Sequence, residues 1–293
     1  MYSAVASPYL VPFDGRFRVA EAATAPPPEA GDEKSLRKRL DQLTEELDEL
    51  QRRLYAQSSW ALLLVFQALD AAGKDSTIRA VMARVDPAGC RVTSFKRPSS
   101  EELGHDFLWR SACRLPERGM IGIFNRSYYE EVLAVRVHPE FLQAQRLPDA
   151  LGKDHELWAG RYQSIRDHES HLARSGTVVL KLWLNVSRGE QRRRFLARLE
   201  EPRKNWKFSP DDVAERGYWQ EYMKAYETAL AETSRPWAPW YAIPADHKPF
   251  LRLAVAETVV ATLKSLGLRY PKTPEELQPT FAAMRAILLA EKD

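Results

Sequence analysis

LLLVFQALDAAGKDSTIRAV, residues 62–81, is the stretch that decides the predicted fold. It begins with an apolar run whose length and composition fit a strand buried on both faces of a sheet. A loop of small residues follows, and Lys74 then opens a helix whose apolar positions include Ile78 and Val81. A strand, a small-residue loop, a Gly-Lys pair and a helix outline a phosphate-binding P-loop, in which backbone N–H groups and the positive end of the helix dipole face the anion.

The loop departs from the usual GxxxxGK pattern, followed by Ser or Thr, at two positions. Ala68 replaces the first glycine, and Asp75 stands where a Mg²⁺-binding hydroxyl is expected. Asp70, inside the loop, could bind Mg²⁺ instead, because hard cations prefer carboxylate oxygen. Gly73 lets the backbone approach a phosphate, and Lys74 supplies a mobile positive charge. The alternative is a strand-to-helix turn that uses Gly73 only for close packing.

The composition limits the class of protein. A chain of 293 residues can bury a sizeable core in one large domain or two small ones. The formal net charge is only +3, so the global charge does not demand a polyanionic partner, and neither nucleic acid nor a membrane is expected as one. Two cysteines, Cys90 and Cys113, show no metal spacing and indicate a reducing compartment. No apolar run approaches the length of a membrane span, and the N-terminus does not resemble a secretory signal, so we expect a cytoplasmic protein.

The N-terminal part divides into an arm and a helix. Residues 1–31 are predicted to form the arm, because three consecutive prolines at 26–28 exclude a helix there. Residues 32–293 are predicted to form a single domain, with Asp32 capping its first helix. Leucines then recur in that helix at spacings of four and three, at Leu36, Leu40, Leu43, Leu47, Leu50 and Leu54. Such a stripe packs on the body of the domain or on a partner subunit, and we expect a homo-oligomer.

Five short apolar segments alternate with helical patterns along the rest of the chain. The predicted strands are residues 61–66, 91–95, 120–124, 177–184 and 240–243. The predicted helices that follow the P-loop helix are residues 99–113, 154–174, 187–200, 209–232, 248–266 and 274–291, with capping boxes at Ser99–Glu102 and Ser187–Glu190. This alternation predicts an α/β fold with a five-stranded parallel sheet flanked by helices.

Polar residues follow the second and third predicted strands. Lys96 and Arg97 come directly after the second strand, and the run NRSYYEE begins at Asn125, after the third. Open α/β sheets bind ligands at the carboxyl ends of their strands. Glu130 and Glu131 are candidates for recognising a metal or a substrate amine. Alternatively, they occupy the first turn of a helix, where the dipole favours acids.

Residues 187–207 hold eight Arg or Lys against three Glu. Arg194 and Arg198 are four apart and share a helix face. The run is either a solvated helix face or, at residues 187–212, a basic lid that closes over a phosphate site. Trp206 and Phe208 could stack on a base, although burial at the lid hinge is the favoured role for them.

Three motifs together resemble the family 2 polyphosphate kinases: FQALDAAGKDSTI at 66–78, FNRSYYEEVL at 124–133 and PRKNWKF at 202–208. The resemblance implies a P-loop kinase fold similar to that of thymidylate kinases. It implies transfer of phosphoryl groups between inorganic polyphosphate and nucleotides, with Mg²⁺ or Mn²⁺.

The resemblance also implies roles for individual residues. Asp70 would bind the metal, Lys74 would hold the polyphosphate or the transferred phosphoryl group, and Arg126 would grip phosphate oxygens. Arg194 and Arg198 would be the charges of the lid, and Asn125 would belong to the same catalytic set. The expected substrate-binding residues are Ala71, Ala72, Gly73, Asp75, Ser76, Lys96, Arg97, Ser127, Tyr128, Glu130, Lys204 and Lys207.

Two positions refine the expected activity. Asn125 stands where many members carry Asp, and an amide is a weaker metal ligand than a carboxylate. Asn125 together with Glu130 resembles the subgroup that phosphorylates both AMP and ADP, giving ADP and ATP reversibly. The alternatives are an ADP-only polyphosphate kinase, an ATP-dependent nucleoside monophosphate kinase, and a catalytically weak polyphosphate or nucleotide sensor.

Overall fold

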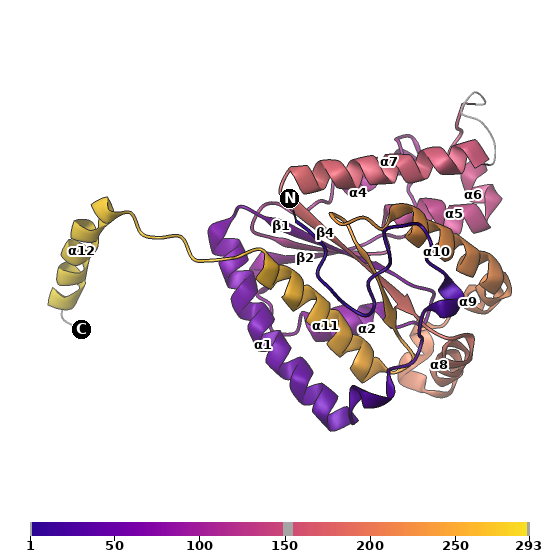
Figure 1. The fold of residues 1–293 in the computed structure, drawn as a ribbon, viewed down its shortest axis with the longest axis horizontal. Helices are drawn as coiled ribbons and strands as arrows, with labels where there is room; N and C mark the ends of the chain where they lie inside the picture. The colour runs from indigo at the N-terminus through magenta and orange to yellow at the C-terminus, as the bar shows by residue number, and fades with distance from the viewer. Residues whose placement is uncertain (1, 149–154, 292–293) are drawn as a thin grey trace.

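The computed structural model describes residues 2–148 and 155–291. One sheet of five parallel strands runs through the centre, in the order β2-β3-β1-β4-β5 (Figure 1). The strands are β1 (Ala61–Gln67), β2 (Cys90–Ser94), β3 (Ile121–Asn125), β4 (Thr177–Asn185) and β5 (Trp240–Pro244). Every predicted strand is present with each end within one residue of the prediction, so the five-stranded parallel sheet is confirmed.

Helices cover both faces of the sheet, as Figure 1 shows. On one face, α1 (Glu33–Gln57), α2 (Lys74–Val81) and α11 (Lys248–Ser265) share a hydrophobic core with β1 and β4. On the other face lie α7 (His155–Arg174) and α10 (Trp219–Thr233). Because helices cover both faces, all seven residues of β1 are buried, which explains its continuous apolar sequence.

The leucine stripe of α1 packs on the body of the domain. Leu36, Leu47, Leu50 and Leu54 are buried in the core that α1 shares with α11. Asp32 caps the helix as predicted, since its carboxylate accepts a hydrogen bond from the Ser35 amide at 2.7 Å.

Further helices and 3₁₀ turns complete the described part of the fold. The other helices are α3 (Ser100–Leu103), α4 (Trp109–Ala112), α5 (Ala134–Val137), α6 (Pro139–Gln143), α8 (Arg188–Glu200), α9 (Pro210–Glu215) and α12 (Gln278–Ala290). The 3₁₀ turns are η1 (Val19–Glu21), η2 (Pro28–Ala30), η3 (Pro87–Gly89), η4 (Tyr128–Val132), η6 (Pro202–Lys207), η7 (Arg216–Tyr218) and η8 (Glu275–Leu277). Among the described residues, no helix combines the length and the hydrophobicity that crossing a membrane requires.

The prediction of one helix over residues 99–113 was wrong. The capping box of Ser99 and Glu102 is present, but α3 ends at Gly104 after a single turn. The Asp106 carboxylate then accepts from the Leu108 amide at 2.9 Å. This side-chain turn competes with the helical hydrogen bonds and separates α3 from α4.

The prediction of one helix over residues 209–232 was also wrong. It is divided into α9, η7 and α10 around Gly217, a residue type that weakens a helix interior. At residues 274–291, η8 precedes α12. The predicted start of the 154–174 helix, Asp154, lies outside the described residues.

The capping box predicted at Ser187–Glu190 is only half formed. The Ser187 hydroxyl accepts from the Glu190 amide at 3.1 Å, as predicted. The Glu190 carboxylate, however, binds Arg193 and Arg194 instead of reaching back to the cap. The stronger attraction of two guanidinium groups explains the difference.

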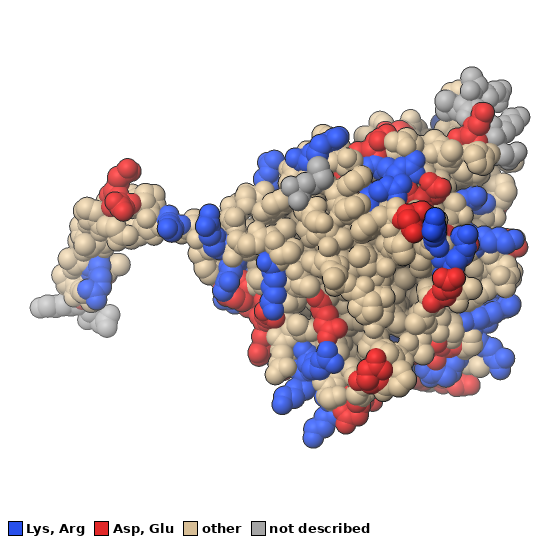
Figure 2. Space-filling view, in the orientation of Figure 1, with Lys and Arg blue, Asp and Glu red and all other residues tan. Residues whose placement is uncertain are grey.

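The two ends of the chain differ in their contacts with the sheet and its helices. The N-terminal arm covers the β5 edge of the sheet: the Val11 amide donates to Trp240 O at 2.9 Å, and the Ala242 amide donates to Tyr9 O at 2.8 Å. At the other end, α12 projects away from the body (Figure 1). Residues 269–291 are all exposed, and the surface of α12 is largely uncharged in Figure 2.

Candidate active site

The P-loop connects β1 to α2. Gly73 precedes the helix with φ at 113°, in the left-handed region that glycine adopts readily. Ala71 also has a positive φ, 62°, which is a strained conformation for alanine. The Lys74 ammonium donates to Ala68 O at 2.6 Å, which places its charge over the loop. The loop predicted from the sequence is therefore formed, with its lysine directed into it.

Asp70 and Arg126 join the P-loop to the turn after β3. The Arg126 guanidinium donates to Asp70 Oδ1 at 2.9 Å. Burial raises the pKa of Asp70, but the charges of Lys74 and Arg126 outweigh it, so the pKa lies below its ordinary value. The pKa of Arg126 is raised, chiefly by Glu130 and also by Asp70. Asp70 is thus ionised at neutral pH, as a metal ligand must be.

Asn125 lies opposite Asp75. The Asn125 amide nitrogen donates to Asp75 Oδ1 at 2.6 Å. A carboxylate at position 125 would meet the Asp75 carboxylate and repel it. Asp75, one of the two departures from the usual P-loop pattern, is therefore compensated by Asn125, which supplies an amide donor at the end of β3 in place of a second carboxylate.

Arg194 supports the P-loop from α8. Its side chain is buried, and its guanidinium donates to Ala71 O at 3.1 Å, Ala72 O at 2.6 Å and Ala245 O at 2.6 Å. Its Nε donates to Glu190 at 2.7 Å. The structure therefore shows Arg194 holding loop carbonyls, while its expected contact with phosphate stays a prediction.

The other lid residues follow α8. Arg198 donates to Asp212 Oδ2 at 2.9 Å, which ties α8 to α9, and Lys204 of η6 pairs with Glu201, the residue that precedes η6. The Lys207 side chain lies outside what the structure describes. Trp206 is 78% exposed, so the favoured prediction that it is buried was wrong. Its place in the short 3₁₀ segment η6, outside the hydrophobic core clusters, explains the exposure.

One cavity brings together four of the predicted cations, Lys74, Arg194, Arg198 and Lys204, but not Arg126. It has a volume of about 410 Å³ and lies between the P-loop, α8 and α11. Eight Lys or Arg side chains line it against three acidic ones. They are Lys74, Arg79, Arg193, Arg194, Arg198, Lys204, Lys248 and Arg252, against Asp70, Asp75 and Glu201. We call this the basic cavity; Ala71, Gly73 and Ser76 also line it, whereas Ala72 contributes only its carbonyl to Arg194.

Sequence reasoning missed four cations of the basic cavity: Arg79, Arg193, Lys248 and Arg252. Lys248 begins α11 just after β5, so the rule that ligands bind at the carboxyl ends of strands could have found it. Arg252 lies four residues further along the same helix face. Burial and the charges of Arg194, Lys204, Arg252 and Arg193 lower the pKa of Lys248. Cations crowded in this way are stabilised by a bound polyanion.

A second cavity, of about 280 Å³, is lined by Arg126, which does not line the basic cavity. Lys96, Arg97, Ser127, Tyr128 and Glu130 line it, together with apolar residues such as Phe95 and Phe107. We call this the mixed cavity. The Tyr128 hydroxyl donates to the buried Glu169, so this hydroxyl is already paired within the protein.

A third cavity, of about 240 Å³, connects the two regions. Asp70 lines it and the basic cavity, whereas Arg126 and Glu130 line it and the mixed cavity. Glu131, the neighbour of Glu130, also lines the mixed cavity, but it forms a buried ion pair with Arg161 of α7 at 2.9 Å. The two adjacent acids thus differ because Glu130 additionally lines the connecting cavity, whereas Glu131 is paired with α7.

Figure 2 shows Lys and Arg interspersed with Asp and Glu over the part of the surface where Figure 1 places α8 and α9. The excess of positive charge therefore belongs to the basic cavity and not to this face as a whole. A parallel sheet, a P-loop at the end of β1 and a basic cavity beside it define a phosphoryl-transfer enzyme of the P-loop class.

The chain belongs to the polyphosphate kinase 2 family, whose model matches residues 30–269. It is 53% identical over 245 residues to the ADP-polyphosphate phosphotransferase of Rhodopseudomonas palustris, covering 84% of this chain and 85% of that protein. It is 43% identical over 230 residues to the AMP/ADP-polyphosphate phosphotransferase of Meiothermus ruber, covering 78% and 82%. The crystal structure of polyphosphate kinase 2 from Arthrobacter aurescens superposes with a TM-score of 0.85 at 36% identity, covering 99% of this chain and 96% of that one.

These relationships confirm the expected P-loop kinase fold and the expected class of reaction. The protein is a polyphosphate-dependent nucleotide phosphotransferase. The individual roles of the site residues stay predictions.

Proposed function

We propose that this protein transfers the terminal phosphoryl group of inorganic polyphosphate to both AMP and ADP, giving ADP and ATP, and that it catalyses the reverse reactions. The observation that carries the proposal is the basic cavity, where eight cations surround the P-loop. Its local excess of five positive charges, eight against three, exceeds the formal net charge of +3 for the whole chain. A chain of phosphates requires such a charge distribution.

The lining of the cavities supports a proposed place for each substrate. Polyphosphate occupies the basic cavity with its terminal phosphate at Lys74. The acceptor nucleotide occupies the mixed cavity, where the apolar Phe95 and Phe107 suit a nucleoside and Arg126 suits its phosphate. The connecting cavity between Asp70 and Arg126 is then where the two phosphates meet.

The chemistry is positioning and charge neutralisation. The attacking group is a phosphate of AMP or ADP that is already largely ionised near neutral pH, so no strong general base is required. The barrier is the repulsion between two anions, which Lys74 and Arg126 reduce. Transfer is direct from one phosphate to the other, without a phosphorylated enzyme intermediate.

Asp70 and Asp75 fit a divalent cation, Mg²⁺ or Mn²⁺. Among the residues that the structure describes, no three His, Cys, Asp or Glu side chains gather to hold a metal by themselves. Mg²⁺ in kinases is instead held by one or two carboxylates together with substrate phosphates and water. Both aspartates line the basic cavity, which meets that requirement. When bound, the cation would supply further neutralisation of phosphate charge.

Glu130 is the proposed determinant of AMP use. The two relatives above differ in their named acceptors, one ADP and the other both AMP and ADP. AMP is one phosphate shorter, so its adenosine must sit deeper or be held by extra contacts. Glu130 is half-buried between two cavities, where it can accept from a ribose hydroxyl or an adenine amine.

The test is steady-state kinetics with polyphosphate and Mg²⁺, first with AMP and then with ADP, followed by separation of the products. We expect both acceptors to react. The Glu130→Asn variant should lose at least about tenfold in kcat/KM for AMP and much less for ADP. Turnover of ADP alone contradicts dual use, turnover with ATP but not polyphosphate as donor identifies a nucleoside monophosphate kinase, and tight binding without turnover identifies a sensor.

The homo-oligomer is also proposed, and the apolar face that α12 forms with Leu277, the residue before it, supports it. Leu277, Phe281, Met284 and Leu288 are all exposed and follow a 4-3-4 spacing. An isolated helix of this length is marginal in water, and two copies of the same stripe are self-complementary. The proposed occupant of this face is therefore α12 of a second copy. Light scattering should show a smaller assembly after truncation at residue 271, whereas an unchanged mass contradicts the proposal.

A further inference from the structure

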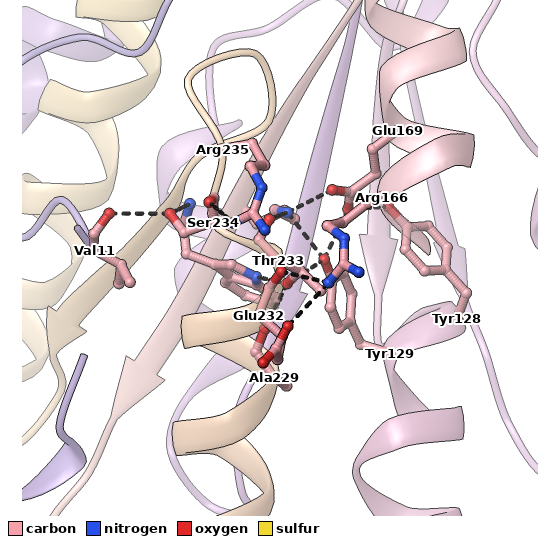
Figure 3. A network of polar contacts seen from close by, with 12 residues as sticks. Val11, Tyr128, Tyr129, Arg166, Glu169, Ala229, Glu232, Thr233, Ser234 and Arg235 are labelled. Carbon is pink, nitrogen blue, oxygen red and sulfur yellow. Dashed lines mark hydrogen bonds and ion pairs between the residues drawn. The ribbon is translucent and has the colours of Figure 1, made fainter. Parts of the chain in front are cut away.

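Two consecutive tyrosines follow the turn that carries Arg126. Tyr128 and Tyr129 are 1% and 0% exposed, although each carries a polar hydroxyl. Both hydroxyls lie 2.9 Å from the same acceptor atom, Glu169 Oε1, in α7. Figure 3 shows the two rings extending from η4 toward Glu169. A single buried carboxylate oxygen therefore contacts two adjacent side chains of η4, of which Tyr129 also has its hydroxyl 2.9 Å from Thr233 Oγ1.

Lys181 completes this cluster from the middle of β4. It and Glu169 are both fully buried, and Lys181 Nζ donates to Glu169 Oε2 at 2.6 Å. The same ammonium donates to Tyr129 Oη at 2.9 Å and to Thr233 O at 2.8 Å. All three ammonium hydrogens are used, so the buried charge is both paired and fully hydrogen-bonded.

Stability alone does not account for such a pair. Removing two ions from water costs several kcal/mol, and apolar side chains of similar volume often serve a core as well or better. The cluster joins elements that apolar contacts already hold together, because α7, α10 and η4 share one hydrophobic core. Hydrogen bonds, unlike apolar contacts, require a defined geometry. Here the hydrogen bonds to Glu169 come from two side chains of η4.

The turn before η4 is fixed at its other end by β1. The Arg126 backbone is left-handed, with φ at 62°, and its amide donates to Phe66 O at 3.1 Å. Gln67 Nε2 donates to the Ser127 hydroxyl at 3.2 Å, and this hydroxyl also accepts from the Tyr129 amide at 3.1 Å. The turn is therefore held between the strand that leads into the P-loop and the buried cluster.

We propose that Glu169, oriented by Lys181, is a positioning residue for phosphoryl transfer. Because it accepts hydrogen bonds from both tyrosines, it fixes residues 126–130 relative to the P-loop. It therefore determines where Arg126 and Glu130 meet the acceptor nucleotide. This inference rests on the proposed place of the acceptor in the mixed cavity. A displacement of about 1 Å in such a constellation lowers a rate by up to about 10²-fold.

Two double variants separate positioning from charge. Both remove the ion pair by Lys181→Met, so neither leaves a buried charge unpaired. In one, Glu169→Gln retains an oxygen that accepts from the tyrosines; in the other, Glu169→Leu removes it. We expect the Gln variant to keep kcat within about threefold of the native protein and the Leu variant to lose at least about tenfold.

The hydroxyls can also be removed from the other side. The Tyr128→Phe/Tyr129→Phe variant keeps both rings and should lose at least about tenfold in kcat, with a changed ratio of kcat/KM between AMP and ADP. The KM for polyphosphate should not change, because the donor binds in the basic cavity. Tyr241→Phe is the matched control: its buried hydroxyl donates to Val5 O at 2.8 Å, away from η4.

Thermal melting first identifies the variants that fold, and kinetics are then measured well below each melting temperature. The proposal is supported when the Leu and Phe variants lose kcat while the Gln variant and Tyr241→Phe do not. It is overturned when the Gln and Leu variants behave alike, or when the Phe variant melts lower but retains the native kcat and acceptor ratio. If the Leu variant does not fold, the Phe variant decides. Activity of the native protein with polyphosphate tests the proposed function separately.

Discussion

The basic cavity and the Lys181–Glu169 cluster are two groups of charged residues in the same sheet fold, and they are built in opposite ways. In the basic cavity, eight cations face three acids, and several, such as Arg193, are exposed. In the cluster, one cation faces one acid, both are fully buried, and every ammonium hydrogen has an acceptor.

The difference shows how each group uses charge. An excess of like charge that remains hydrated is unfavourable until a polyanion arrives, so it favours binding. A balanced pair in the core attracts no ligand, but its hydrogen bonds fix neighbouring elements in one arrangement. The predictions below test this division, in order of decreasing effect.

The largest effect should come from Lys74→Ala. The side chain directs its charge into the P-loop, where transition-state charge develops, and removal of such a contact costs about 10²–10³ in kcat. Lys264→Ala is the matched control, since Lys264 is exposed and pairs with Glu46 on the outer surface. Retention of more than half the native activity removes Lys74 from the mechanism.

Asp70→Asn should lower kcat by about 10²-fold and raise the Mg²⁺ concentration needed for half-maximal activity. The charges of Lys74 and Arg126 keep the Asp70 carboxylate ionised, and an amide cannot replace that charge. Asp41→Asn, at an exposed ion pair with Arg84, serves as the control. A native Mg²⁺ dependence in the Asp70 variant excludes Asp70 as the metal ligand.

Arg194 and Arg198 share a helix face but should respond differently to replacement by lysine. Arg194 makes several hydrogen bonds to buried loop carbonyls that lysine cannot reproduce, so Arg194→Lys should lower the free energy of unfolding by about 2–3 kcal/mol. Arg198→Lys should cost less than about 1 kcal/mol, because its pair with Asp212 is partly exposed. Urea unfolding measures both, and equal losses contradict the structural role of Arg194.

The smallest effect concerns pH. Burial lowers the pKa of Lys181 to about 8 in the folded protein, below its ordinary value of 10.5. Between these values the unfolded state binds more protons, so the free energy of unfolding should increase with pH. Relative to the Lys181→Met/Glu169→Gln variant, the native protein should gain about 1–2 kcal/mol between pH 7.5 and 9.5. The raised pKa values of Tyr128 and Tyr129 act oppositely only above about pH 10. Parallel pH profiles contradict this interpretation.

The sequence predicted what short-range patterns encode. The strand ends, the P-loop and the Ser99 capping box depend on neighbouring residues, and all are present. The breaks after Gly104 and at Gly217 were missed because a helical pattern continues across them, while a side-chain turn or a glycine ends the helix locally.

Contacts between distant segments could not be predicted in the same way. The sequence did not indicate that the donors of Arg194 reach carbonyls of two loops that lie on either side of it in the sequence. The pairing of Asn125 with Asp75 and the burial of Lys181 against Glu169 likewise depend on the packing of separate elements. The sequence alone does not show whether a charged residue will contact a ligand, a backbone carbonyl or another side chain.

The central claim is that polyphosphate binds in the basic cavity, and the salt dependence of its binding is the most direct test. The affinity for polyphosphate of defined length would be measured between low and high salt for the native protein and two triple variants. One replaces Arg193, Lys248 and Arg252 of the cavity by Gln, and the other replaces the exposed Arg16, Lys224 and Arg285. The predicted result is weaker binding with a reduced salt dependence in the cavity variant and no change in the other variant. Of the two sets of replaced charges, only the cavity set faces the bound polyanion. Equal changes in the two variants would contradict it.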